Sequence, residues 1–289
     1  MELKANRAGA AACAPARVRA PARTLPAFAA LALLLLLARG ASALDISPTF
    51  VDEPPGTMNR QVWDAARQAV ILDAISDWES LILNDRVVDV TFDFTREGAD
   101  GYLAQWEGSY NLPPGSTTNL FPWTPQVVHR VRFNSDQLLR PGTRLAFVPG
   151  SQYPGPDVWD ALTVTRHELA HMMGFVGGFY RANASVAGSD KWAARVQINP
   201  PDATFDPAGL NVPLESSSDI GHVSEIKPYY ANDLMNVSLA SGMRREITPL
   251  HVDMLELAYG YQVVPEPGSL AAACVAGALL LTRRRRRAS

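Results

Sequence analysis

The chain has 289 residues, of which 47% are hydrophobic and 19% are charged, a composition that is ordinary for a globular protein. Its formal net charge of −3 hides an acidic centre, because residues 44–262 carry 15 Lys and Arg against 27 Asp and Glu, a net charge of −12. A surface of that sign repels phosphate backbones, so nucleic acid is not expected as a partner.

The first 43 residues have the order of a secretory signal peptide. Basic residues precede an apolar run at residues 25–38, and the small residues 41–43 form a cleavage site. We therefore expect a signal peptide at residues 1–43 and export of the chain. An uncleaved signal anchor is the alternative, but the apolar run is shorter than the roughly 20 residues that span a bilayer.

The segment after the signal peptide has the patterns of a helix followed by strands. Apolar residues recur every three or four positions at residues 71–82, which predicts a long amphipathic helix. Apolar and polar residues alternate at residues 87–94 and again at residues 127–133, as they do in half-buried strands. A further short strand is expected at residues 143–149. These elements predict an α+β fold.

A second helix is expected to begin at Asp157 and to end at Gly174, because no other Gly or Pro interrupts this segment. It carries the pattern His-Glu-x-x-His. Residues four apart lie on one face of a helix, so His167 and His171 can direct ring nitrogens at one ion while Glu168 approaches from the side. Zinc binds imidazole and, with three protein ligands, keeps a position for water. Glu168 is then the expected general base for amide hydrolysis.

The third metal ligand is missing from the position where metzincin zinc peptidases have it. In their pattern this ligand is the sixth residue after the second histidine, which here is Gly177. The remaining histidines are His129, His222 and His251. His129 shares a strand face with apolar residues and is expected in the core. His251 is expected to be exposed in the first turn of a closing helix at residues 248–260. His222 differs from both, because it follows a glycine at the end of a long irregular segment.

Residues 166–175 and 219–261 resemble the leishmanolysin-like metzincins, a family of zinc peptidases. The shared features are His-Glu-x-x-His followed by Gly-Phe, a later histidine, a methionine turn and a final helix that ends in Gly-Tyr. The resemblance implies that His222, 51 residues beyond the second histidine of the motif, is the third zinc ligand. It also implies that Met235 forms a hydrophobic floor under the metal and that Gly174 turns the chain away from the helix.

Three departures from the family leave an alternative open. The similarity does not extend into the insertion, Val237 stands where a tyrosine ligand would follow Met235, and residues 44–262 contain no cysteine that could form a disulfide. A glutamate could then replace the third histidine, as in gluzincins. Glu215 and Glu225 are the candidates, but nearby prolines interrupt a second helix around either one.

The resemblance implies an α+β, zincin-like fold for a metallopeptidase domain at residues 44–262. Residues 44–175 are expected to form an N-terminal subdomain with a twisted mixed sheet and the active-site helix. Residues 176–262 are expected to form an irregular C-terminal subdomain that ends in a helix. In zincins an extended substrate pairs with an exposed edge of the sheet. We expect that edge at the strand formed by residues 127–133 or at the strand after it.

Residues 263–289 have three parts in order: Pro-Glu-Pro, an apolar run at residues 270–281, and arginines at residues 283–287. Arginines after an apolar segment act as a stop-transfer signal. The arrangement resembles the PEP-CTERM sorting signal of Gram-negative bacteria. The resemblance implies transient membrane anchoring, processing by an exosortase-type enzyme, and a location in the cell envelope or extracellular matrix, with release once the tail is processed. A permanent tail anchor is the alternative.

Together these features predict an exported zinc-dependent endopeptidase that cleaves a protein or peptide substrate. The alternative is an envelope or matrix protein that keeps the zincin fold and binds its partner without catalysis. The intact Glu168 favours the endopeptidase, since a domain used only for binding has no chemical need of a carboxylate beside the ion.

Overall fold

The computed structural model describes most of the chain between residues 44 and 264. The described residues are 44–98, 101–110, 127–139, 144–150, 152–175, 192, 195–216 and 218–264. The expected signal peptide, the apolar run of the expected sorting signal and Gly177 lie outside them. Among the described residues, no helix is both long and apolar enough to cross a membrane.

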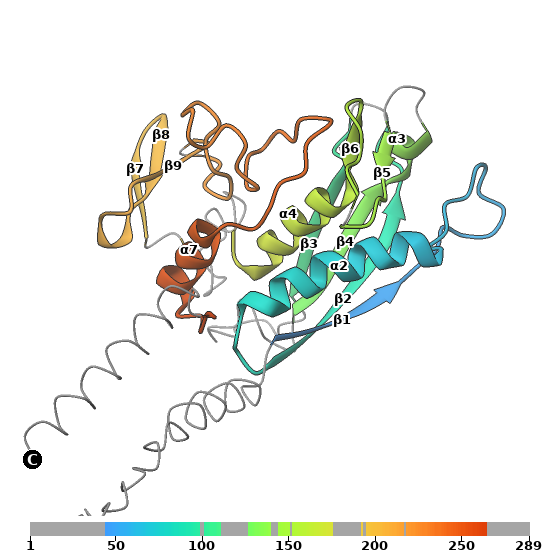
Figure 1. The fold of residues 1–289 in the computed structure, drawn as a ribbon, viewed down its shortest axis with the longest axis horizontal. Coiled ribbons are helices and arrows are strands. Elements are labelled where there is room, and N and C mark those ends of the chain that lie inside the picture. The colour runs from blue at the N-terminus through green and yellow to red at the C-terminus, as the bar shows by residue number, and fades with distance from the viewer. Residues whose placement is uncertain are drawn as a thin grey trace, which may run out of the picture. The chain divides into compact units, whose positions relative to one another are not determined.

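A mixed four-stranded sheet forms the core of the N-terminal half (Figure 1). Its strands lie in the order β1 (Leu44–Phe50), β2 (Arg86–Thr95), β4 (Val127–Asn134) and β3 (Ala104–Tyr110). The first three are parallel to one another, and β3 is antiparallel to β4. Val88, Val90 and Phe92 of β2 are buried, so the strand predicted at residues 87–94 is confirmed.

The exposed edge of this sheet is not the strand expected from the sequence. β4 lies between β2 and β3, and the following strand, β5 (Arg144–Ala146), pairs with β6 (Val158–Asp160) in a separate two-stranded sheet. The prediction was therefore wrong, because β1 and β3 are the two edges of this sheet among the described strands. The sequence of β3, AQWEGSY, alternates weakly and contains a glycine, so its local pattern gives no strong strand signal.

Two helices pack on one face of the sheet (Figure 1). The first, α2 (Ala65–Leu81), is N-capped by Asp64 and buries the apolar stripe that the spacing predicts. The second, α4 (Ala161–Met173), packs against α2 and against β3. The Trp78 indole N–H donates a hydrogen bond to the Arg166 carbonyl oxygen at 3.1 Å. This bond joins the two helices at the centre of the core.

The first turn of α4 differs from the expected one. Asp160, not Asp157, is the N-cap, and its Oδ2 accepts hydrogen bonds from the N–H and the hydroxyl of Thr163 at 3.1 and 2.7 Å. The predicted start was wrong because residues 158–160 pair with β5 as a strand and so cannot begin a helix. The expected end at Gly174 is confirmed, and this residue has a φ of 135°.

Replacing Gly174 with alanine should lower the free energy of unfolding by about 2–4 kcal/mol. A φ of 135° disfavours a side chain, and an added Cβ would collide with the Tyr259 ring, whose hydroxyl donates to the Gly174 carbonyl at 2.8 Å. Gly56→Ala is the matched control, because Gly56 has a φ of 90° and open space around it. The control should lose only about 1 kcal/mol. Urea unfolding measures both losses, and equal values would contradict a packing role for Gly174.

The C-terminal half is more regular than expected. A three-stranded antiparallel sheet follows Trp192 and consists of β7 (Val196–Asn199), β8 (Asp202–Phe205) and β9 (Val212–Leu214), with the 3-10 turn η1 (Pro207–Gly209) before β9. Trp192 stacks on Phe205 with ring centroids 4.6 Å apart. The expectation of irregular structure was wrong here, because strands of three or four residues are too short to show clear alternation.

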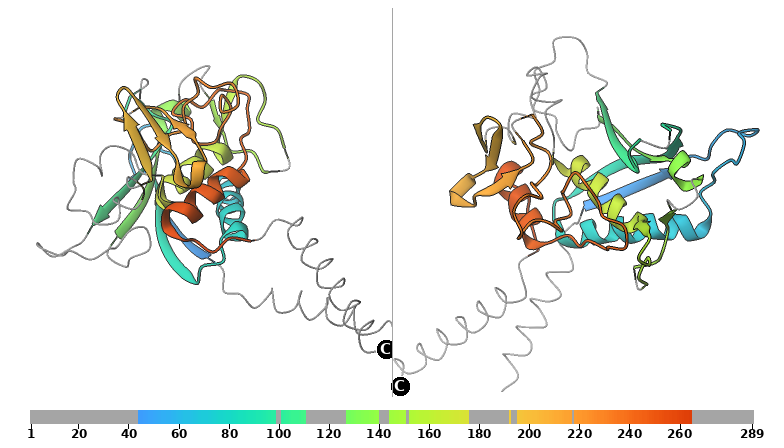
Figure 2. Two further views of the ribbon diagram at one scale, coloured as in Figure 1. Left: turned by 90° about the vertical axis from the view of Figure 1, so that its left-hand side faces the viewer. Right: turned by 90° about the horizontal axis from the view of Figure 1, so that it is seen from above.

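The closing helix, α7 (Pro249–Tyr259), has the bounds that the sequence predicts. Thr248 is its N-cap, and Gly260 follows its end in the left-handed region with a φ of 73°. Figures 1 and 2 place α7 and the β7–β9 sheet together near the end of α4, away from α3 (Ser135–Leu139). The described structure is therefore α+β, with the mixed sheet in its N-terminal half and a helix at its C-terminal end.

Candidate metal centre

Three histidine side chains converge at α4. The Nε2 atoms of His167 and His171, one helical turn apart, lie 3.1 Å from each other, and the Nε2 of His222 lies 3.2 Å from that of His171. An isolated β-bridge between Leu214 and Val223 returns the chain to this position. Among the described residues, these three histidines form a group whose nitrogens are close enough to hold one metal ion.

The second nitrogen of each ring contacts an oxygen that can only accept a hydrogen bond. The partners of the three Nδ1 atoms are the Leu234 carbonyl for His167, the Phe175 carbonyl for His171 and the Asp219 carboxylate for His222. Each Nδ1 therefore carries the proton, and each Nε2 presents a lone pair. The Nε2 atoms cannot hydrogen bond with one another in this state, so their convergence suits a cation, as it does in metal-binding histidines.

Burial favours the protonation states that metal binding needs. Desolvation lowers the pKa of His167 well below its ordinary value, and desolvation, with the nearby His222 imidazole opposing a second positive charge, lowers the pKa of His171 to about 3. Burial alone would raise the pKa of Asp219, but the hydrogen bond from His222 lowers it overall. Neutral His167 and His171 and an ionised Asp219 follow at neutral pH, where protons do not compete with a metal for either imidazole.

Glu168, the residue after His167, is held by the edge strand of the sheet. Its Oε2 accepts a hydrogen bond from the Trp106 N–H of β3 at 2.6 Å. Burial raises the pKa of Glu168 to about 8, although the bond from Trp106 acts in the opposite direction. A cation held by the neighbouring histidines would stabilise the charged carboxylate and oppose the effect of burial.

Met235 is fully buried in a turn whose backbone contacts the histidine-bearing segments. Its carbonyl oxygen accepts a hydrogen bond from the Val223 N–H at 2.8 Å, and Val223 directly follows His222. The preceding carbonyl, that of Leu234, is the acceptor for His167. The turn therefore connects two of the three histidines.

His251 lies in a different environment from the one expected, because it is fully buried rather than exposed. Its Nδ1 accepts the Thr248 N–H at 2.8 Å, and its Nε2 donates to Asp233 Oδ1 at 2.9 Å. The same oxygen accepts the Met235 N–H at 2.8 Å. His251 thus supports the methionine turn and lies outside the metal group. The Thr-x-x-His spacing, with histidine in the place of the usual glutamate of a capping box, could have indicated this role.

The other candidate ligands also lie outside the three-histidine group. His129 is buried, as expected, and its Nδ1 accepts a hydrogen bond from the Trp106 indole N–H at 3.3 Å. Glu225 is exposed, and Glu215 is not among the grouped ligands. The described structure therefore forms a three-histidine group rather than one completed by a glutamate.

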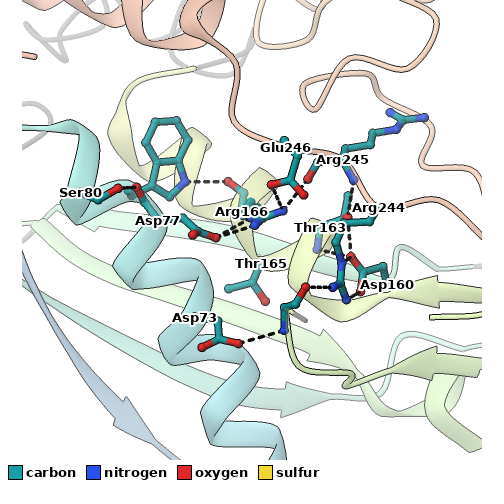
Figure 3. Close-up of polar contacts among 12 residues, drawn as sticks. Asp73, Asp77, Ser80, Asp160, Thr163, Thr165, Arg166, Arg244, Arg245 and Glu246 are labelled. Carbon is teal, nitrogen blue, oxygen red and sulfur yellow. Dashed lines mark hydrogen bonds and ion pairs between the residues drawn. The ribbon is translucent and has the colours of Figure 1, made fainter. Parts of the chain in front are cut away.

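An ion-pair network that sequence reasoning missed fixes α4 in place (Figure 3). The Arg166 guanidinium lies 2.7 Å from Asp77 of α2 and 2.7 Å from Glu246, and it donates to the Arg245 carbonyl at 2.8 Å. Arg166 directly precedes His167, so these bonds set where the helix presents the first of its two histidines. The sequence pattern gives no warning of the network, because charged residues are mostly exposed.

A second arginine holds the start of α4 in the same view (Figure 3). Arg244 donates to both carboxylate oxygens of the N-cap Asp160, at 2.9 and 2.8 Å. It also donates to carbonyl oxygens of the preceding loop, those of Val148, Pro149, Gly150 and Gln152. Since Arg244 follows the methionine turn in the chain, it ties that part of the C-terminal half to the helix that carries the histidines.

The described structure thus brings His167, His171 and His222 into one group and places Glu168 and Met235 in the segments around it. No protein-family model matches the chain, and a search of curated proteins finds no match either. The function is therefore inferred from the chemistry of this group.

Proposed function

We propose that the chain is an exported zinc-dependent endopeptidase of the metzincin type. The observation that carries the proposal is the convergence of three Nε2 lone pairs, two of them from α4, the helix that also carries the buried Glu168. Tetrahedral ligands at zinc–nitrogen distances of roughly 2.0–2.1 Å lie about 3.3 Å apart. The 3.1 and 3.2 Å separations between Nε2 atoms are close to that value, so the residues fit the ion.

The mechanism assigns one role to each residue. Zinc, when bound, supplies a Lewis acid and lowers the pKa of a bound water to about 7. His167, His171 and His222 would hold the ion through their Nε2 atoms. Glu168 takes the proton of the attacking water and passes it to the leaving amine. The Trp106 N–H fixes Oε2 of this carboxylate, which leaves the other oxygen to carry the proton.

Supporting residues tune this site. Asp219 accepts the Nδ1 proton of His222, which orients the ring and makes its Nε2 a stronger ligand. Met235 is buried in the turn beside the histidine segments and is proposed to form the hydrophobic floor under the metal. Gly174 allows the chain to leave α4 abruptly, so that the third ligand returns from a distant segment.

The substrate is proposed to be an extended protein or peptide segment. Among the described strands, β3 pairs with β4 alone and is an edge of the sheet. An extended peptide can add to such an edge by backbone hydrogen bonds. Because β3 also donates its Trp106 N–H to Glu168, a peptide on this edge would lie near the general base. The antiparallel edge strand beside the ligand-bearing helix supports a zincin-like fold.

The ends of the chain complete the proposal. Residues 1–43 act as a signal peptide, residues 44–262 as the metallopeptidase domain with subdomains divided after residue 175, and residues 263–289 as the PEP-CTERM sorting segment. The tail anchors the protein transiently until an exosortase-type enzyme processes it. The expected location is the cell envelope or extracellular matrix of a Gram-negative bacterium.

Removing the metal tests this function directly. The purified protein should contain about one zinc ion per chain and cleave a denatured protein. A chelator should abolish cleavage and lower the melting temperature, because an ion that binds only the folded state stabilises it. Added zinc should restore both properties. A protein that binds zinc stoichiometrically yet cleaves nothing across a broad peptide library would instead be a binding protein.

A further inference from the structure

Glu215 pairs with His222, a member of the metal group, across a short antiparallel pairing. Leu214 and Val223 form the bridge, and the Glu215 N–H donates to the His222 carbonyl at 2.9 Å. Glu215 is therefore directly opposite His222. Directly opposite residues in an antiparallel pair extend to the same face, with Cβ atoms about 5 Å apart. Leu214 and Val223 are buried on the other face, which agrees with this alternation.

One carboxylate oxygen of Glu215 lacks a partner, although the residue as a whole is half-buried. Its Oε2 is buried without a hydrogen bond, and no Lys or Arg in the described part of the chain forms an ion pair with it. His222 cannot supply one, since its Nδ1 proton goes to Asp219 and its Nε2 points to His171. A buried polar atom left unsatisfied is destabilising, and more so when it is charged. An unsatisfied buried atom in a native structure needs an explanation, and one explanation is that a bound ligand supplies the missing hydrogen bond.

We propose that Glu215 is a specificity-determining residue that binds the cationic side chain of a Lys or Arg in the peptide substrate. The inference rests on the proposed peptidase function and names the class of its substrate. A lysine ammonium or arginine guanidinium would satisfy the buried oxygen by a charge-assisted hydrogen bond. The net charge of −12 over residues 44–262 would draw basic segments toward the site.

The role is distinct from metal binding. Glu215 does not belong to the group of ligands that could share one ion, although it lies beside His222. Mutation of a residue that binds the metal would lower the metal content of the protein. Mutation of a residue that binds the substrate side chain would change only which peptides the protein prefers. These two readouts separate the possibilities.

The test compares peptide binding in the Glu168→Gln background, which prevents cleavage during the measurement. Fluorescence anisotropy would give the affinities of peptides that carry lysine or the uncharged norleucine at each position in turn. We expect a preference for lysine at one position, and Glu215→Gln should reduce that preference at least about tenfold. Glu225→Gln makes the same change at an exposed carboxylate three residues after His222 and should leave the preference intact.

Metal analysis and a second variant make the outcome decisive. Glu215→Gln should retain its metal, and Glu215→Asp, which keeps the charge with a shorter reach, should show an intermediate preference. An unchanged preference in a folded, metal-loaded Glu215→Gln protein would overturn the proposal, as would loss of the metal. Absence of cleavage by the wild-type protein would count against the peptidase function alone, because the binding preference is measured without cleavage.

Discussion

The Glu168→Gln variant is expected to hydrolyse peptides about 10²- to 10⁴-fold more slowly than the wild-type protein, the range that general acid–base catalysis contributes. Glutamine has nearly the same shape as glutamate and can still accept the Trp106 N–H bond that now holds Oε2 at 2.6 Å. It cannot take a proton from water. The loss should therefore appear in kcat while the zinc content remains at about one ion per chain.

A matched control separates this effect from a general change of charge. Glu256→Gln removes an exposed carboxylate from α7 and should leave both activity and zinc content unchanged. Wild-type rates in a zinc-loaded Glu168→Gln protein would show that Glu168 is not the base. If neither the wild type nor the variant cleaves any peptide while both bind zinc, the alternative of a zincin-like binding protein replaces the peptidase.

Local spacing explains why part of the site could be predicted from the sequence. His167 and His171 are four residues apart on one helix, so helical geometry alone puts their Nε2 atoms together. The end of that helix was also predictable, because Gly174 is its first glycine and has a positive φ. The start was not, since Asp157 and Asp160 are equally good caps and only the pairing of β6 with β5 decides between them.

Contacts between distant segments explain what the sequence could not show. The edge position of β3 depends on the order of strands in the sheet, which no local pattern encodes. His251 was expected to be exposed because polar residues are common in a first helical turn. It is buried because Asp233, 18 residues earlier, supplies a partner for its Nε2. Asp219 and Arg166 were likewise missed, since their roles depend on partners that fold against them.

The third ligand is the intermediate case. His222 lies 51 residues from His171, so helical geometry says nothing about it. With one histidine in the expected core and another in a predicted helix, the family resemblance favoured His222 for the metal. The described structure brings His222 into the group with its Nδ1 on Asp219. Its role as a zinc ligand is a proposal that mutation can test.

His222→Ala is expected to weaken zinc binding by more than about 100-fold, because it removes one of the three nitrogens proposed to hold the ion. Asp219→Asn should have a smaller effect, about 10- to 100-fold, since it leaves the ligand and disturbs only its orientation and basicity. Titration with a competing chelator of known affinity measures both. The larger loss of zinc affinity is expected for His222→Ala because His222 is the proposed ligand, whereas Asp219 only supports that ligand through a hydrogen bond.

His251→Ala is the control that distinguishes a ligand from a buried histidine of another role. It removes the bond to Asp233 and leaves a buried carboxylate short of one partner, so the free energy of unfolding should fall by about 1–3 kcal/mol. Zinc content should nevertheless stay near one ion per chain, because no histidine of the metal group is altered. If His222→Ala keeps its zinc while His251→Ala loses it, His251 must be the third ligand, and the leishmanolysin-like interpretation of the 51-residue insertion fails.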